Sequence, residues 1–206
     1  MNYSLIFMLE EKREKFKKIS EKTGGAFSKF GLTPNQYTLI SLLFVLISFS
    51  FLIKKNLALA LIFFLIATIL DFIDGAVAKF LQKETKKGAY LDTTCDRYVE
   101  GIVILGFLFL PLPDFILPAK IWVFLALFGS LMTTYTKAAA KEKELVTGEL
   151  KKGFLGRVER VILIILSMLL GILNLSWIIY PIIILAILSN ITALQRIYLS
   201  LAPGKD

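Results

Sequence analysis

Four aspartates in the middle of the chain have the spacing of a metal-binding site on a helical hairpin. Asp71 and Asp74 are three residues apart, and Asp92 and Asp96 are four apart. Residues at these spacings share one face of an α-helix. The short polar segment 80–87 joins the two helices, which predicts antiparallel neighbours whose acidic faces meet. Carboxylates that converge at low dielectric constant repel one another unless cations offset them, and Mg²⁺ or Mn²⁺ would bind such oxygen ligands.

The aspartates also lie at the ends of strongly apolar runs, where a charge that is not offset is costly. A charged Asp at the centre of a membrane helix costs on the order of 2.5–3.5 kcal/mol, whereas a Leu or Ile contributes only about 0.3–0.6 kcal/mol. We therefore expect the four side chains to line a partly hydrated cavity that holds a pair of divalent ions. The alternative is a solvated loop flanked by aspartates that cap two helices.

The residues beside the aspartates suit the binding of phosphate. Gly75 has no side chain, so the backbone there can approach a phosphate or a ribose, and Ala78 keeps the same helical face open. Lys79 can bind phosphate as a point charge, or it can be a helix-end lysine that reaches the membrane surface. Metal ions beside basic residues stabilise an in-line displacement at phosphorus. Because the chain has no His, a carboxylate is the favoured general base.

This pattern resembles the signature of the CDP-alcohol phosphatidyltransferase family. The positions that match the signature at its fixed gaps are Asp71, Asp74, Gly75, Ala78, Gly88, Asp92 and Asp96. One departure is Lys79, where the family usually has Arg, so the planar fork that binds phosphate bidentately is missing. The resemblance in length and hydropathy covers nearly the whole chain.

The resemblance implies the substrates and the roles of the motif residues. The donor would be a CDP-alcohol, here a CDP-lipid, and its diphosphate would be held by Mg²⁺ or Mn²⁺ on Asp71, Asp74 and Asp92. Asp96 would take the proton from the acceptor hydroxyl and would be a further metal ligand. The acceptor hydroxyl would attack the phosphorus that bears the lipid, and CMP would leave. The residues implied in nucleotide binding are Asp71, Asp74, Gly75, Ala78, Lys79, Gly88 and Asp92.

Basic residues further along the chain predict the acceptor. The stretches Tyr135–Ala138 and Gly156–Arg160 resemble those that contribute the acceptor pocket in family members that use inositol phosphate. They carry Lys137, Arg157 and Arg160, and several cations around one cavity favour an acceptor that itself bears phosphate. We expect inositol 1-phosphate, with glycerol 3-phosphate second and serine third, as in phosphatidylglycerophosphate and phosphatidylserine synthases. Alternatively, these cations are ordinary charges at cytoplasmic helix ends.

The composition is typical of a polytopic membrane protein. The chain has 206 residues, 56% of them hydrophobic, and a mean hydropathy of +0.72, which is too apolar for a soluble domain of this size. Its apolar runs predict an all-α protein with six transmembrane helices, at about 37–53, 57–80, 88–110, 115–140, 158–173 and 178–199. We expect an amphipathic interfacial segment at 1–32, followed by a six-helix transmembrane catalytic domain at 33–206.

The distribution of Lys and Arg predicts the orientation. Most basic residues lie near the two termini, in the turn at 80–87 and in the loop at 141–156, whereas the opposite side has only Lys54, Lys55 and Lys120. Both termini and the active site should therefore be cytoplasmic, in the cell membrane. The net charge of +8 fits anionic lipids and a phosphorylated substrate better than nucleic acid. The loop at 141–156 faces the same side and could cover an entrance, and the family resemblance suggests a homodimer.

Three further residues are singled out by local pattern. Thr33, Pro34 and Gln36 have the form of a helix start with a capping box, and Asn35, beside them, is a candidate near the nucleotide. Cys95 is expected to be a small packing residue. One Cys and no His exclude a disulfide framework and a Cys/His zinc site.

Two other classes of membrane protein also use clustered aspartates. Membrane prenyltransferases carry two Asp-rich motifs, but these are usually far apart on a longer chain. Ion or metal transporters would show broken helices or two similar halves, and neither is visible here. Release of CMP from a CDP-lipid separates both classes from a phosphatidyltransferase.

Overall fold

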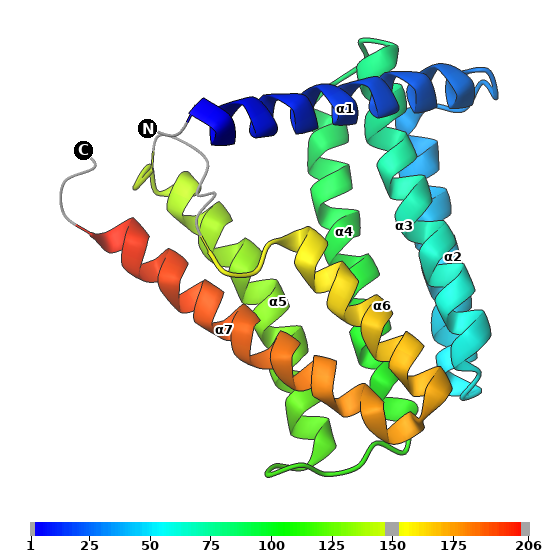
Figure 1. Cartoon of the computed structure of the whole chain (residues 1–206), viewed down its shortest axis with the longest axis vertical. Coiled ribbons are helices and arrows are strands. Elements are labelled where there is room, and N and C mark those ends of the chain that lie inside the picture. The colour runs from blue at the N-terminus through cyan, green and yellow to red at the C-terminus, as the bar shows by residue number, and fades with distance from the viewer. Residues whose placement is uncertain (1–2, 147–152, 203–206) are drawn as a thin grey trace. The chain divides into compact units, whose positions relative to one another are not determined.

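The computed structural model describes residues 3–146 and 153–202 and is helical throughout most of that length (Figure 1). The described residues form seven α-helices and two 3-10 helices. Their bounds are α1 Tyr3–Ser28, α2 Pro34–Ile53, α3 Leu57–Phe80, α4 Lys86–Gly106, η1 Phe107–Phe109, α5 Ala119–Glu142, α6 Arg157–Leu173, η2 Leu175–Ile178 and α7 Ile179–Leu201.

The chain divides into two compact units, and three of the helices contribute to both. The first unit comprises Met1–Phe44 and Phe64–Asp96, and the second comprises Val45–Phe63 and Arg97–Asp206. The first unit therefore contains α1, the start of α2, the end of α3 and the start of α4. All four aspartates of the predicted site belong to this unit.

A close contact between two helices organises the first unit. Helix α1 runs crosswise to the end of α3 (Figure 1), and Gly24 and Gly25 form the contact. A Cβ atom at Gly24 would overlap the carbonyl oxygen of Ala76 and would lie 2.7 Å from Cβ of Phe80, and one at Gly25 would lie 3.2 Å from the Phe80 ring. The two glycines thus allow the α1 backbone to approach α3 more closely than any other residue would.

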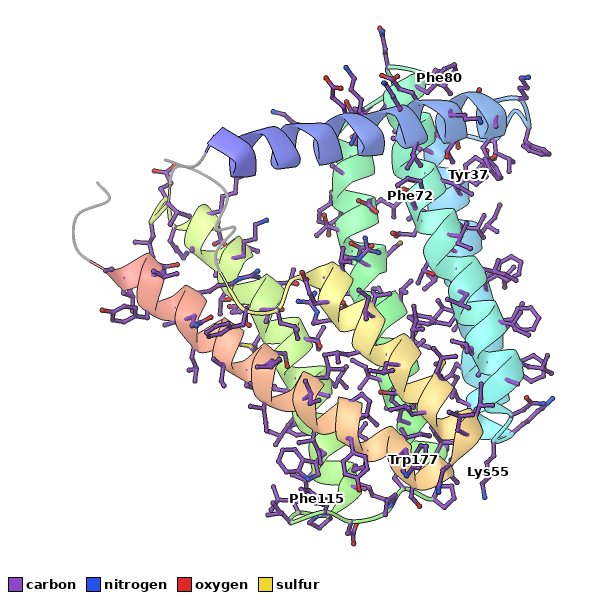
Figure 2. The ribbon with its side chains drawn as sticks, in the orientation of Figure 1. Tyr37, Lys55, Phe72, Phe80, Phe115 and Trp177 are labelled. Carbon is purple, nitrogen blue, oxygen red and sulfur yellow. The ribbon has the colours of Figure 1, made fainter. Side chains whose placement is uncertain are left out.

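A small apolar core lies next to this contact. Its buried residues are Tyr37, Ile73 and Val77, from α2 and α3. The partly buried residues packed against it are Phe27, Leu32, Leu70 and Leu81. The hydroxyl of Tyr37, a residue labelled in Figure 2, donates to the Phe27 carbonyl over 2.9 Å. The end of α1 is therefore held to α2 by a hydrogen bond as well as by packing.

The start of α2 has the predicted capping box. The backbone N–H of Gln36 donates to Thr33 Oγ1 over 3.3 Å, and the N–H of Thr33 donates to Gln36 Oε1 over 2.7 Å. Pro34 is the first residue of the helix, where it has no hydrogen bond to lose. This local prediction is confirmed.

The second unit is built around α5, α6 and α7, and α7 packs against both of the others (Figure 1). Gly129 on α5 lies against Ser189 and Asn190 on α7, where a Cβ atom would overlap both side chains. The side-chain amide of Asn190 donates to the Leu125 carbonyl over 2.9 Å. The small residue Gly129 therefore lets α5 and α7 approach closely, and this hydrogen bond links the two helices.

Five of the six predicted apolar runs coincide with helices to within a few residues, whereas the fourth begins too early. The run was predicted from residue 115, but α5 begins at Ala119. Phe115 and Leu117 instead exchange backbone hydrogen bonds of 3.2 and 2.6 Å across a tight turn, and the N–H of Ala119 donates to Asp114 Oδ1 over 2.8 Å. Pro118, at the N-cap, disfavours helical backbone in the residue before it, which explains the late start.

Four of the described helical segments are long and apolar enough to cross a membrane: Pro34–Ile53, Leu57–Phe80, Ala119–Glu142 and Leu175–Leu201. Helix α4 is more highly charged, because it carries Asp92, Asp96, Arg97 and Glu100, and α6 has only 17 residues, fewer than the roughly 20 that a bilayer requires. The chain is therefore a multi-pass membrane protein.

In the second unit, Lys55, Phe115 and Trp177 lie at the same end (Figure 2). Of the loop predicted at 141–156, residues 147–152 lie outside the described part of the chain.

Candidate functional site

Three of the predicted metal ligands come together in the first unit. Asp71 and Asp74 on α3 and Asp92 on α4 each have a carboxylate oxygen within 4.8 Å of the others, and we call them the aspartate cluster. Oxygens that share one Mg²⁺ at about 2.1 Å are separated by roughly 3–4 Å, so small side-chain movements would close the cluster on an ion. Like charges at such distances repel strongly, which makes a bound cation a good fit.

Asp96 lies one turn further along α4 and is outside this cluster of three. Its side chain is buried, with 7% of its surface exposed. The spacing of four residues places Asp96 on the same helical face as Asp92, as predicted. The two aspartates on α4 therefore differ in surroundings: Asp92 is only partly buried and lines a cavity, whereas Asp96 is buried deeper in the unit.

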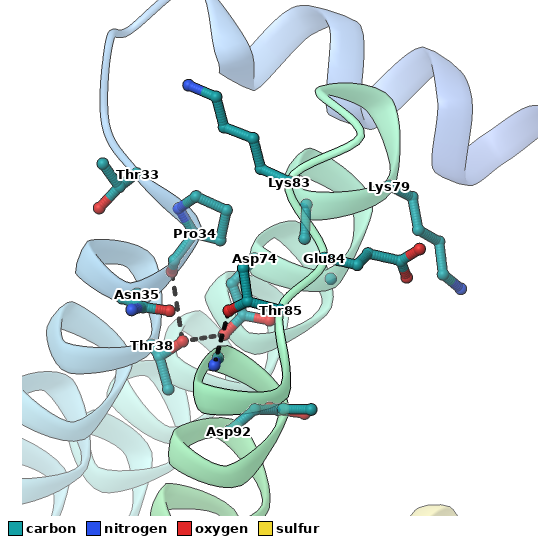
Figure 3. A pocket seen from close by; sticks show the side chains of 14 residues that line it. Thr33, Pro34, Asn35, Thr38, Asp74, Lys79, Lys83, Glu84, Thr85 and Asp92 are labelled. Atoms are coloured by element: carbon teal, nitrogen blue, oxygen red, sulfur yellow. Dashed lines mark hydrogen bonds between the residues drawn. The ribbon is translucent and has the colours of Figure 1, made fainter.

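Asp74 is held in place by a hydroxyl group from α2. Thr38 Oγ1 donates to Asp74 Oδ2 over 2.6 Å, and both side chains are buried (Figure 3). The Thr38 hydroxyl also lies 3.2 Å from the Pro34 carbonyl, but it has one proton, and the carboxylate is the closer and stronger acceptor. The sequence reading missed Thr38. It is three residues from Asn35 and shares its helical face, so the Asn35 candidate could have pointed to it.

A cavity of about 570 Å³ opens beside the aspartate cluster (Figure 3). The residues that line it come from the start of α2, the end of α3, the connecting turn and the start of α4: Thr33, Pro34, Asn35, Thr38, Asp74, Gly75, Ala78, Lys79, Lys83, Glu84, Thr85, Gly88, Ala89 and Asp92. The structure thus places the two predicted glycines, Ala78, Lys79 and Asn35 around one cavity within the first unit.

Small residues keep this cavity open. A Cβ atom at Gly75 would meet no atom of the described residues within 4 Å, so a larger side chain there would project into open space. Gly88 is tighter: a Cβ would lie 3.1 Å from Thr85 Oγ1 and 3.3 Å from Asn35 Oδ1. Thr85 precedes α4 and accepts a hydrogen bond of 3.0 Å from the Gly88 N–H, which caps the helix that carries Asp92.

The two lysines at the rim do not reach toward the carboxylates. Lys79 and Lys83 are exposed, and in Figure 3 their amines extend away from Asp74. Both lysines are long and flexible, so they suit contact with a large anionic ligand that fills the cavity rather than with the aspartates themselves.

The three basic residues predicted for the acceptor all belong to the second unit, and they differ in exposure. Lys137 on α5 and Arg157 at the start of α6 are partly exposed. Arg160 is only 2% exposed, and its guanidinium donates to Glu100 Oε1 over 3.0 Å and to Thr133 Oγ1 over 2.9 Å. Arg160 is therefore bonded inside the unit.

Two residues near these cations were not singled out from the sequence. Glu100 continues the spacing of four residues from Asp92 and Asp96, and this repeat was the available signal. Arg196 on α7 donates to the Thr133 carbonyl, and only its place near the end of an apolar run set it apart. Cys95 is buried and carries a free thiol, which agrees with a packing residue.

Comparison with known proteins gives the class. A model of the CDP-alcohol phosphatidyltransferase family matches residues 31–192, so this chain belongs to that family and is an enzyme that transfers substituted phosphate groups. The prenyltransferase and transporter alternatives are excluded by this membership.

The chain is similar to two kinds of family member over most of its length. It is 33% identical over 191 residues to an archaetidylinositol phosphate synthase of Pyrococcus horikoshii, covering 93% of this chain and 95% of that one. It is 30% identical over 199 residues to a phosphatidylinositol phosphate synthase of Mycolicibacterium smegmatis, covering 90% and 85%.

The fold is similar to that of a solved phosphatidylinositol phosphate synthase of Mycobacterium tuberculosis. The structure with CDP-DAG bound has a TM-score of 0.77 and 25% identity, covering 91% of this chain and 96% of that one. A second structure of the same protein, in complex with manganese and citrate, also has a TM-score of 0.77. The similarity thus extends to a protein seen with a CDP-lipid and with a divalent metal ion.

Proposed function

We propose that this chain transfers a phospho-alcohol group from a CDP-lipid to inositol 1-phosphate and releases CMP. The observation that carries the proposal is the meeting of Asp71, Asp74 and Asp92 at the edge of a 570 Å³ cavity. The inositol phosphate acceptor is supported by the similarity to archaetidylinositol and phosphatidylinositol phosphate synthases. Glycerol 3-phosphate and serine are the alternatives to be tested beside it.

In the proposed site, the first unit holds the nucleotide. Asp71, Asp74 and Asp92, with Asp96 as a further ligand, would hold Mg²⁺ or Mn²⁺, which would neutralise the diphosphate oxygens. The nucleotide would lie along the cavity, in contact with Gly75, Ala78, Lys79 and Gly88 as well as with the cluster. The openness at Gly75 and the hydrogen bond from Thr38 to Asp74 support this arrangement, because one leaves room for the ligand and the other orients a carboxylate.

Asp96 is proposed to be the general base. Its carboxylate would accept the proton of the acceptor hydroxyl as the oxygen forms a bond to the lipid-bearing phosphorus, and the bond from that phosphorus to the CMP oxygen would break. Asp96 lies outside the cluster of three and is buried, which supports a role as base in addition to that of a further ligand.

Lys137 and Arg157 are proposed to contact the phosphate of the acceptor. Both are partly exposed cations of the second unit, and two cations favour an acceptor with a phosphate group. Arg160 was predicted to join them, but its burial supports an indirect contribution. Arg196 is a further cation of the same unit that suits this role, because part of its guanidinium is engaged by a backbone carbonyl and the group is thereby oriented.

We also propose the placement in the membrane. Helices α2–α7 would be six spans of a catalytic domain at 33–206, and residues 1–32 would form an interfacial helix, with both termini and the site cytoplasmic. Labelling by a membrane-impermeant maleimide tests the sidedness in a Cys95→Ala background. In intact cells, a cysteine at Lys55 should react and one at Lys143 should not; the reverse pattern would invert the proposed orientation. We further propose a homodimer, as the family resemblance suggests, and chemical cross-linking between exposed apolar helix faces would test it.

An acceptor panel tests the function directly. Purified protein in CDP-lipid micelles would be given inositol 1-phosphate, glycerol 3-phosphate, serine or free inositol, and CMP release and the lipid product would be measured with Mg²⁺, with Mn²⁺ and after chelation. Inositol 1-phosphate should give the highest kcat/KM, and chelation should stop turnover with every acceptor. Equal use of free inositol, or turnover without divalent metal, would contradict the proposal.

A further inference from the structure

Glu100 and Arg160 form a buried ion pair in the second unit, and Glu100 has a second cationic partner. Arg160 Nε donates to Glu100 Oε1 over 3.0 Å, and Arg97 Nη1 donates to Glu100 Oε2 over 2.8 Å. The Glu100 side chain is 2% exposed and that of Arg160 is 3% exposed. One carboxylate therefore holds two guanidinium groups, one from its own helix and one from α6.

Two neighbouring threonines of α5 complete the arrangement. Arg160 Nη1 donates to Thr133 Oγ1 over 2.9 Å, and Arg97 Nη1 donates to Thr134 Oγ1 over 2.9 Å. We call these five residues the Glu100 cluster. Through it, α4, α5 and α6 are joined by charge-assisted hydrogen bonds; those of Arg160 are buried, where such bonds are strong, and those of Arg97 are partly buried.

The cluster lies about one helical turn or less from three of the residues proposed to act on the acceptor. Arg160 follows Arg157 by three residues on α6, and Lys137 follows Thr133 by four on α5. On α4, Arg97 directly follows Asp96. The bonds of the cluster therefore fix the turns from which these side chains project.

We infer that Glu100 is a positioning residue for the phosphorylated acceptor, acting by holding Arg160 and Arg97. Arg160 then contributes through Glu100 and does not itself bind the acceptor phosphate. This inference rests on the proposed function, because it assumes an acceptor that carries phosphate and residues Lys137 and Arg157 that meet it.

The alternative, in which Arg160 itself binds the acceptor phosphate, predicts the opposite change in acceptor binding when the Glu100 charge is removed. If Arg160 bound the acceptor phosphate directly, Glu100 would compete with that phosphate for the guanidinium. Removal of the Glu100 charge would then strengthen acceptor binding. If Glu100 positions the turns around it, removal of its charge weakens acceptor binding instead.

The test is steady-state kinetics of Glu100→Gln, which keeps the size of the side chain and one acceptor oxygen. We expect the KM for the phosphorylated acceptor to rise by about tenfold, with the KM for the CDP-lipid changed by less than about twofold. Glu142→Gln is the matched control, because Glu142 is exposed and pairs with Lys143 on the surface. An acceptor KM that falls or stays at the wild-type value would overturn the inference.

A second variant keeps the inference refutable if Glu100→Gln does not fold in detergent. The double variant Glu100→Gln with Arg160→Gln removes both charges of the pair, so no charge is left buried alone. Its acceptor KM should also rise by about tenfold, no more than either single change, because the two residues act as one unit. A wild-type acceptor KM in the folded double variant would overturn the inference.

The acceptor panel separates failure of this inference from failure of the proposed function. If the wild-type protein uses glycerol 3-phosphate in place of inositol 1-phosphate, the assignment of the acceptor is wrong. The acceptor KM of Glu100→Gln is then measured with glycerol 3-phosphate. If it uses only an acceptor without phosphate, the positioning role for an acceptor phosphate is overturned.

Discussion

The aspartate cluster of the first unit and the Glu100 cluster of the second unit gather charges in opposite ways. The first brings three carboxylates within 4.8 Å beside a cavity of about 570 Å³. The second places a single carboxylate between two guanidinium groups, with Glu100 and Arg160 almost fully buried. Like charges at the edge of a cavity suit the binding of a cation, whereas opposite charges that pair inside a unit suit a structural role.

The largest effect should come from Asp96, which belongs to neither cluster. Asp96→Asn should lower kcat by about 10³-fold, because a general base contributes about 10²–10⁴-fold and an amide cannot take its place. Binding of CMP in the presence of Mg²⁺, measured by calorimetry, should remain. Loss of nucleotide binding together with turnover would show that Asp96 belongs functionally with the aspartate cluster.

A smaller effect, on one substrate only, is expected from the cations of the second unit. Lys137→Ala and Arg157→Ala should each raise the KM for the phosphorylated acceptor by about 10- to 100-fold, because each removes a charge-assisted hydrogen bond to phosphate. The KM for the CDP-lipid should stay the same. Lys143→Ala, which removes an exposed cation, is the control. An unchanged acceptor KM in both variants would remove these residues from the acceptor site.

A moderate effect is expected from Thr38, which donates a hydrogen bond to the aspartate cluster. Thr38→Val keeps the shape of the side chain but removes the donor to Asp74, and a hydrogen bond to a charged group contributes about 1.5–3 kcal/mol. We expect an affinity for CMP with Mg²⁺ that is about tenfold weaker. Thr68→Val is the matched control, because that hydroxyl donates to the Leu65 carbonyl of its own helix. Equal effects of the two changes would show that Thr38 has no special role.

The smallest effect concerns the departure from the family pattern at Lys79. Lys79→Arg should lower the KM for the CDP-lipid by about two- to fivefold, because guanidinium can bind a phosphate through two parallel hydrogen bonds. Lys120→Arg makes the same change in the second unit and should have no effect. A higher KM after Lys79→Arg would show that the cavity is shaped for the narrower ammonium group.

The sequence predicted the parts of the site that depend on spacing along one helix. The separations between Asp71 and Asp74, and between Asp92 and Asp96, place each pair on one face, and the short polar turn between the helices allows the faces to meet. The aspartate cluster has this arrangement for three of the four residues. The capping box at Thr33 was predicted equally well, because all of its partners lie within four residues.

Contacts between distant parts of the chain were not predictable in the same way. Thr38 and Asp74 are 36 residues apart, and Glu100 and Arg160 are 60 apart, so only the packing of helices brings them together. The pairing with Glu100 also buries Arg160, which was predicted from the sequence to bind the acceptor. The start of α5 was predicted too early for a different reason. Phe115 and Leu117 are as apolar as residues of a helix core, so hydropathy alone does not distinguish the turn before Pro118 from a helix.

The contact at Gly24 and Gly25 has a consequence for the depth of the site in the bilayer. Gly24 lies against Ala76, the immediate neighbour of Gly75 at the cavity, so α1 and this turn of α3 should lie at the same depth in the membrane. If α1 lies among the lipid headgroups, as proposed, it would hold the cavity at the depth of the donor's diphosphate.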